Sequence, residues 1–347
     1  MTRFCFRPSA FCLLSSAFLL VLPSSAPAQH RGFTAAPLVA HAYDTILDAA
    51  FERLSGALAD VCGPAPRCAC LGLEALGLWW QIQLDPDSRA LDATFMAKTE
   101  AAIAEADRFT KASPDRAEAW FYLGAAFGVR AQYRVLRLER LGAARDGKRI
   151  KDALERALAI DPEMHDAEFG LGMYRYYADI APATLKFLRW LLLLPGGNRV
   201  EGLQQLERAS RQGLLVRGEA QYQLHVIDLW YEQKFREALA IVIDLQGRYP
   251  HNPYFRQVEA EVLDGYFHDH AASLHASEVL LALALGNQVH RADIAEVRAR
   301  LNMATQYRAL RQPDRAVKEL DAVIARRPGA PAGALAHAEQ MRAELRR

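Results

Sequence analysis

One spacing recurs four times along the chain and constrains its fold more than any other feature. An apolar residue is followed by another four residues later, and by proline twelve residues after the first. The four sets are Ala102/Ala106/Pro114, Ile150/Leu154/Pro162, Ala238/Val242/Pro250 and Ala316/Leu320/Pro328. Residues four apart share one face of a helix, and proline cannot continue a helix. The spacing therefore predicts a helical unit that is repeated along the chain.

The residues between these sets also favour helix. Most of the chain is rich in Ala, Leu, Glu and Arg, which are strong helix formers. Leu73, Leu76, Trp80 and Leu84 recur at helical spacing, and the following Asp-Pro-Asp at 85–87 stops that helix. No run alternates apolar and polar residues for long enough to indicate a strand. The sequence predicts an all-α fold.

The repeat resembles the tetratricopeptide superfamily, whose unit is a helix pair of about 34 residues with W-x2-L-G-x2-Y in its first helix. Residues 120–127 match this motif with Phe in place of Tyr. The resemblance implies antiparallel helix pairs stacked into a right-handed superhelix, or solenoid. Trp120 would then be buried between the helices of its pair, and Gly124, Gly172 and Ala304 would let paired helices approach closely.

The spacing of the four prolines indicates how the units are arranged. Successive prolines are 48, 88 and 78 residues apart. The first interval fits one unit with about 14 extra residues near 131–147, and each of the others fits two units. We expect a signal peptide at 1–28, an N-terminal helical segment with a cysteine-containing loop at 29–86, and the repeat domain at 87–347. Segment 170–203 is similar to a segment of uncharacterised bacterial envelope repeat proteins.

The first 28 residues have the features of a secretory signal peptide. Arg3 and Arg7 precede an apolar stretch, and Ala-Pro-Ala at 26–28 supplies small residues before the expected cleavage site. Removal of this segment leaves 40 basic residues against 41 acidic ones. Such a balance gives no basic footprint for nucleic acid. We therefore expect a periplasmic or secreted protein.

Three cysteines of the expected mature chain lie close together. Cys62, Cys68 and Cys70 fall within the loop-like stretch VCGPAPRCAC. In an oxidising compartment Cys62 can pair with either Cys68 or Cys70, which leaves one free thiol. A zinc site would usually require a fourth ligand, and a thioredoxin-like centre would require C-x-x-C. We favour the disulfide.

Motifs of known chemistry are missing from the sequence. The glycines at 170–172 and 195–198 complete neither a dinucleotide fingerprint nor a phosphate-binding loop, and neither a G-x-S-x-G nor an H-E-x-x-H motif occurs. His268, His270 and His275 offer imidazoles, but residues two apart on a helix point in different directions. We expect no catalytic residues, no cofactor and no metal.

The resemblance to tetratricopeptide repeats also implies a concave groove lined by the first helix of each pair. Matched residue by residue, the groove candidates for partner binding are Phe121, Ala125, Phe169, Met173, Tyr176, Tyr177, Tyr222, Val226 and Trp230.

Two functions remain open from the sequence. The first is a non-enzymatic scaffold that binds a protein or peptide partner in the cell envelope. The second is a helical-repeat receptor for a small ligand, or an enzyme, with carboxylates or histidines in a pocket. A deep pocket would favour the second and a shallow groove the first.

No transmembrane segment is expected in the mature chain, and the apolar stretch 185–194 is a candidate for peripheral membrane contact.

Overall fold

The computed structural model describes residues 32–181, 196–327 and 329–346. In these ranges the chain forms 15 α-helices and no strand, which confirms the all-α prediction. None of these helices is long and apolar enough to cross a membrane. The described residues form one compact unit. The expected signal peptide at 1–28 and the apolar stretch 185–194 lie outside the described residues.

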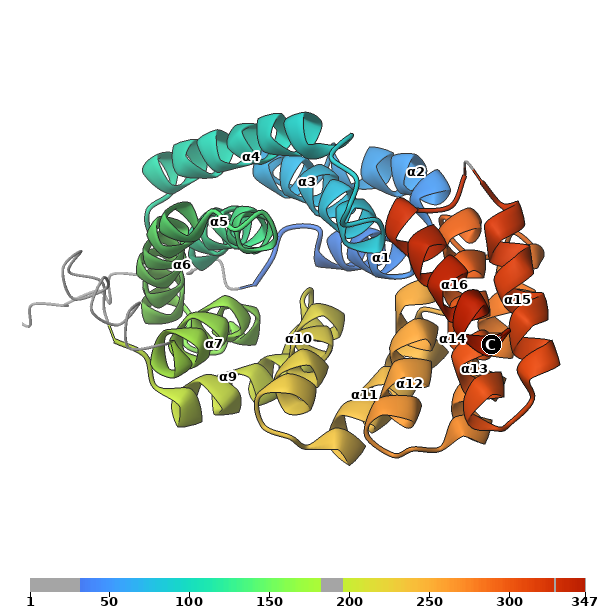
Figure 1. Cartoon of the computed structure of the whole chain (residues 1–347). Coiled ribbons are helices and arrows are strands. Elements are labelled where there is room, and N and C mark those ends of the chain that lie inside the picture. The colour runs from blue at the N-terminus through green and yellow to red at the C-terminus, as the bar shows by residue number, and fades with distance from the viewer. Residues whose placement is uncertain (1–31, 182–195, 328, 347) are drawn as a thin grey trace, which may run out of the picture. The chain divides into compact units, whose positions relative to one another are not determined.

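Helices that follow one another in the sequence pack together in pairs (Figure 1). The first four pairs are α1 (Ala36–Leu47) with α2 (Phe51–Val61), α3 (Arg67–Leu84) with α4 (Asp92–Ala112), α5 (Ala117–Leu136) with α6 (Arg140–Ile160), and α7 (His165–Ile180) with α9 (Arg199–Gln212). Three more pairs are α10 (Arg217–Trp230) with α11 (Phe235–Arg248), α12 (Pro253–Gly265) with α13 (His270–Leu285), and α14 (Ala292–Ala309) with α15 (Pro313–Ala325). The last helix, α16 (Ala332–Leu345), packs against α15. This sequential packing is consistent with a helical repeat.

The recurring spacing falls on the second helix of a pair in all four cases. Its buried members include Ala106 in α4, Leu154 in α6, Val242 in α11 and Leu320 in α15, none of them more than 2% exposed. The first three prolines follow the ends of α4, α6 and α11, whereas the fourth lies outside the described residues. The extra residues in the first interval lengthen α5 and α6 to 20 and 21 residues.

Small residues allow the paired helices to approach closely, as the sequence predicted. A Cβ atom on Gly124 would lie 2.5 Å from Leu154 Cδ2 in α6, and one on Gly172 would lie 2.8 Å from the carbonyl oxygen of Gly202 in α9. Ala304 in α14 is fully buried. An added Cβ atom at either glycine would therefore require its neighbours to move.

The prediction that Trp120 is buried between α5 and α6 is wrong. Trp120 is only half-buried, and its indole Nε1 donates a hydrogen bond to the carbonyl oxygen of Pro114 at 3.0 Å. This bond holds the indole at the turn before α5. The neighbouring Phe121 and Tyr122 are buried instead, because α5 is also covered by α3.

The N-terminal helices contact segments that are about 200 residues away in the sequence. The pairs that join them are Tyr249 with Asp44, Asn252 with Leu47, Phe51 with His290, and Arg291 with Asp85. The hydroxyl of Tyr249 donates to Asp44 at 2.8 Å, and the amide of Asn252 donates to the carbonyl oxygen of Leu47 at 2.7 Å. The segment expected at 29–86 thus supplies α1 to α3, and it packs against both α4 and later helices.

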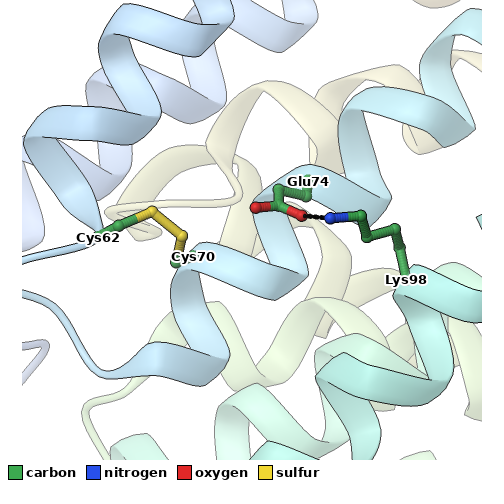
Figure 2. The surroundings of a disulfide bond; sticks show 4 residues. All are labelled: Cys62, Cys70, Glu74 and Lys98. Carbon is green, nitrogen blue, oxygen red and sulfur yellow. Dashed lines mark hydrogen bonds and ion pairs between the residues drawn. A yellow bond between two sulfur atoms is a disulfide. The ribbon is translucent and has the colours of Figure 1, made fainter.

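A disulfide joins α2 to α3 (Figure 2). Of the two partners left open by the sequence, Cys70 is the one that pairs with Cys62, with 5.1 Å between their Cα atoms. Cys68 is free and buried. The stretch is less loop-like than expected, because helix α3 already begins at Arg67 and includes both Cys68 and Cys70. In the same region Lys98 of α4 forms an ion pair with Glu74 of α3 (Figure 2).

Candidate binding cavity

A cavity of about 800 Å³ lies among α1, α3, α5, α6, α7 and α10. We call it the inner cavity. Its lining is mostly apolar and includes Val39, Leu73, Leu76, Phe121, Val129, Ile150, Leu154, Phe169, Met173, Leu215 and Val216. Sites for small molecules typically occupy roughly 300–1,000 Å³ and combine such a lining with a few polar groups. The inner cavity is therefore large enough for a ligand of that class.

The space exists because small residues occupy the lining positions of several helices. Gly72 of α3 and Gly128 of α5 both line the inner cavity, and a Cβ atom on either would meet nothing within 4 Å. At Gly124, by contrast, α5 and α6 are in contact, and an added Cβ atom would lie too close to Leu154. Gly72 and Gly128 therefore leave volume empty and do not serve close packing.

Side-chain hydrogen bonds fix α10 against the other walls of the inner cavity. The bonded pairs are Trp80 Nε1 to Glu219 Oε2 at 3.2 Å, Tyr222 OH to Gln83 Oε1 at 2.9 Å, and Gln223 Nε2 to Gln132 Oε1 at 3.0 Å. Two of these bonds reach α3 and one reaches α5. The lining is thus held in one arrangement by bonds between elements far apart in the sequence.

Asp166 of α7 is the second carboxylate in the lining, and it has a structural role. It is 4% exposed and accepts hydrogen bonds from the backbone N–H groups of Leu214, Leu215 and Val216, at 2.9, 2.6 and 2.9 Å. These groups precede the first turn of α10. Its oxygens are therefore satisfied by the chain itself.

Four other polar atoms in lining residues have no hydrogen-bond partner in the described part of the chain. They are Trp79 Nε1, Gln83 Nε2, Tyr122 OH and Glu219 Oε1. Trp79, Tyr122 and Glu219 are 3%, 7% and 1% exposed. A buried polar group without a partner costs about 1–3 kcal/mol, so such groups are few in native proteins. These four atoms are themselves inaccessible to water, so the inner cavity contacts their residues through other atoms.

Burial shifts the ionisation of the groups in this region. Removal of Glu219 from water raises its pKa to about 7, against 4.5 for an ordinary Glu, although hydrogen bonds from Trp80 and Gln223 act in the opposite direction. Burial, together with the nearby Glu219 and Asp166, raises the pKa of the Tyr43 phenol well above 10. Tyr43 is only half-buried, as expected of a group that faces an apolar space and not bulk water. The tyrosines therefore stay neutral near pH 7, while Glu219 titrates there.

The free thiol in the lining is not suited to nucleophilic chemistry. Burial raises the pKa of Cys68 to about 12, and the charge of Glu118 acts in the same direction. The thiolate is the nucleophilic form of cysteine. Cys68 is therefore protonated at neutral pH and contributes to the lining as a small apolar residue.

The structure places five of the nine groove candidates on the inner cavity. Phe121, Ala125, Phe169, Met173 and Tyr177 line it. The other four, Tyr176, Tyr222, Val226 and Trp230, do not belong to the lining.

These four residues have different surroundings. Tyr176 is fully buried and its hydroxyl donates to Glu232, and Tyr222 is buried against Trp80. Val226 is half-buried and Trp230 is 55% exposed.

On α10 the lining series is displaced by one residue from the candidates. Gln223 and Tyr231 line the inner cavity, where the sequence suggested Tyr222 and Trp230.

Several residues of the lining were not identified from the sequence. Glu219 is the clearest case, since it lies three residues before Tyr222 and shares its side of the helix. The signal in the sequence that could have identified Glu219 was an acidic residue on a helix face whose other residues are buried. Trp79 and Gln83 also lie four apart in α3, in the helix that was recognised only for its apolar spacing.

The described residues include no group of three or more His, Cys, Asp or Glu side chains that could hold a metal ion. In the histidine cluster, Nδ1 of His270 is 3.0 Å from Asp264 Oδ1 and 2.9 Å from Gln306 Oε1, and Nδ1 of His268 is 3.1 Å from the backbone carbonyl oxygen of Asp264. These contacts are internal to the fold. The chain matches no known protein-family model, and no curated protein is similar to it in sequence.

Proposed function

We propose that the protein binds a mostly apolar small molecule in the inner cavity, without catalysis. The observation that carries the proposal is the mostly apolar lining of a space of about 800 Å³. Apolar walls of this kind would bury most of the surface of the ligand. Of the two functions open from the sequence, this is the small-ligand receptor.

The apolar lining also limits the charge of the ligand. Moving a charged group from water into an apolar space is costly unless the group is paired. We therefore infer an uncharged ligand whose surface is mostly apolar.

Displacement of a fluorescent probe tests this proposal. N-phenyl-1-naphthylamine is an uncharged apolar fluorophore, and we expect its emission to rise when it enters the inner cavity. Dodecanol, dodecanoate and dodecylamine have the same apolar chain and differ in the end group. Dodecanol should displace the probe at the lowest concentration. No probe binding, or equal displacement by all three, would count against the proposed ligand class.

Filling the inner cavity provides the matched variant. Gly128→Leu places a side chain where a Cβ atom meets nothing within 4 Å, and Gly56→Leu does the same on the exposed side of α2. Both changes replace glycine in a helix interior, which stabilises the helix by up to about 1 kcal/mol. Only Gly128→Leu should abolish probe binding. Equal binding by the two variants would place the probe elsewhere.

The wider setting is also part of the proposal. We propose that the helix pairs form a right-handed tetratricopeptide-like superhelix, supported by the recurring spacing on second helices. A periplasmic or secreted location is supported by the Cys62–Cys70 disulfide and by the character of residues 1–28. N-terminal sequencing of the exported protein should then give Gln29 as the first residue, and an intact Met1 would contradict cleavage.

Partner binding as a scaffold is a second proposal, favoured by one observation. Trp230 at the end of α10 is 55% exposed and the following Tyr231 is 49% exposed. Exposed aromatic residues are enriched among residues that dominate protein interfaces. Crosslinking in cell envelopes, followed by mass spectrometry, would test this idea. A partner that is retained by Trp230→Ala at wild-type yield would argue against a role for this residue.

A further inference from the structure

The turn between α5 and α6 exposes apolar side chains next to the inner cavity. We call residues 135–141 the rim turn. Val135, Leu136, Leu138 and Leu141 are 64%, 36%, 74% and 50% exposed. The first three also belong to the lining of the inner cavity. The apolar surface of the inner cavity therefore continues onto the outside of the protein at this turn.

Packing does not explain the leucine in the rim turn. Leu138 is 74% exposed, so its apolar side chain gains little from burial. Its φ of 63° lies in the left-handed region, which Gln233, His268 and Arg311 also adopt at the turns of other helix pairs. Polar residues therefore suit this turn geometry, and the exposed leucine is a property of this surface.

Buried ion pairs hold the rim turn in place. Arg130 and Arg134 of α5 both bond to Asp146 of α6, with distances of 2.7 Å for each closest pair. Arg137 within the turn bonds to Asp92 at 2.7 Å and to the carbonyl oxygen of Pro86 at 2.7 Å. These bonds therefore fix the position of the turn that carries the exposed leucines.

Unpaired basic residues lie beside these leucines. Arg140, Arg145 and Arg149 are exposed, and none forms an ion pair within the described ranges. Leu141, Arg145 and Arg149 follow one another at four-residue spacing, so they share a face of α6. An apolar tip beside a row of free cations is the pattern of a surface that binds anionic membranes.

We propose that the rim turn docks the protein on an anionic lipid bilayer, with Leu138 and its apolar neighbours in the headgroup region and the three arginines on acidic headgroups. This inference rests on the proposed function, since an uncharged, mostly apolar ligand partitions into bilayers and would reach the inner cavity through the apolar surface at the turn. The three exposed arginines favour an anionic bilayer over an uncharged apolar partner at this surface.

Flotation of the exported, processed protein with lipid vesicles tests the proposal. We expect it to float with vesicles of phosphatidylglycerol and phosphatidylethanolamine, to float less as salt is added, and to stay unbound with phosphatidylcholine alone. Replacing Arg145 and Arg149 together by Glu should weaken binding by roughly 25-fold or more, because each basic residue near an anionic surface contributes about fivefold. Leu138→Asn should weaken binding while suiting the left-handed backbone.

Matched controls lie on other exposed helices. Leu285→Asn changes a leucine that is 59% exposed at the end of α13, and Arg236→Glu reverses an exposed charge in α11. Neither should alter flotation. Binding that is equal for neutral and anionic vesicles, or that survives both rim-turn changes, overturns the proposal. Displacement of the fluorescent probe without vesicles reports on the inner cavity alone, so failure of docking and failure of ligand binding are separate results.

Discussion

The indole Nε1 of Trp80 in α3 donates a hydrogen bond to Glu219 Oε2 in α10 at 3.2 Å, and so joins two helices that are 139 residues apart in the sequence. Trp80 is fully buried and Glu219 is 1% exposed. The bond satisfies one carboxylate oxygen, and the side chain of Gln223 also favours the ionised form of Glu219. The contact joins an N-terminal helix to a helix in the second half of the chain. It also involves Glu219, the titratable group of the inner cavity.

The raised pKa of Glu219 makes the stability of the protein depend on pH in a defined direction. Between its unfolded value of 4.5 and its folded value of about 7, the native state keeps a proton that the unfolded chain releases. The free energy of unfolding must therefore fall as pH rises through this range. A pKa difference of this size between the folded and unfolded states corresponds to about 3 kcal/mol in the free energy of unfolding.

Glu219→Gln tests this effect, because glutamine can accept the same bond from Trp80 and does not ionise. Urea unfolding at pH 5 and pH 8 should show the wild type losing about 3 kcal/mol relative to the variant. His225, whose pKa burial lowers to about 4, acts in the opposite direction but is present in both proteins. A difference between the two proteins that does not change with pH would show that Glu219 titrates normally.

Glycine-to-alanine changes should have opposite effects at two positions. At Gly172 the new methyl group would lie 2.8 Å from the backbone oxygen of Gly202, so α7 and α9 must move apart. We expect a loss of roughly 1–3 kcal/mol, as is usual for overpacking. At Gly128 nothing lies within 4 Å, so alanine should stabilise α5 by up to about 1 kcal/mol. Thermal unfolding of both variants checks the contrast, which a shared sign would contradict.

The disulfide predicts a specific pattern of thiol reactivity. Cys68 is buried and its pKa is raised to about 12, so iodoacetamide at pH 8 should not modify the native protein. After the processed protein, which lacks residues 1–28, is unfolded without reductant, one residue should be modified, and mass mapping should find Cys62 bridged to Cys70. Removing the bridge by changing both cysteines to serine should cost about 2–3 kcal/mol for so short a loop. Rapid modification of the native protein would contradict the burial of Cys68.

Local features of the fold could be predicted from the sequence, because helix periodicity and helix termination depend on nearby residues. The spacing that ends in Pro114 marked α4 correctly, and Gly124 marked the contact of α5 with α6. The packing of the N-terminal helices against later ones could not be predicted. It depends on pairs such as Tyr249 with Asp44, which belong to no local pattern.

The inner cavity was only partly predictable for a similar reason. Candidates on α5 and α7, such as Phe121 and Met173, line it because helical phase carries reliably along one helix. On α10 the lining passes through Gln223 and not Tyr222, since the phase of a helix relative to its neighbours depends on how the preceding turn is built. The volume itself comes from absent side chains at positions such as Gly128, which sequence patterns do not register.

Two residues one turn apart in α7 should separate core packing from ligand binding. Tyr176 is fully buried and outside the inner cavity, and its hydroxyl donates to Glu232, which also pairs with Arg199. Tyr176→Ala should therefore cost about 3–5 kcal/mol in the free energy of unfolding. Met173 is half-buried and lines the inner cavity, so Met173→Ala should cost less, about 1 kcal/mol.

Probe binding should follow the opposite order at a temperature where both variants are folded. Met173→Ala removes contacts with the ligand and should weaken binding of N-phenyl-1-naphthylamine, whereas Tyr176→Ala should leave its affinity nearly unchanged, because Tyr176 does not touch the cavity. Measuring unfolding and probe affinity on each variant distinguishes the two roles. If Tyr176→Ala weakened the probe and Met173→Ala did not, the binding surface would lie on the other face of α7, and the inner cavity would not be the site.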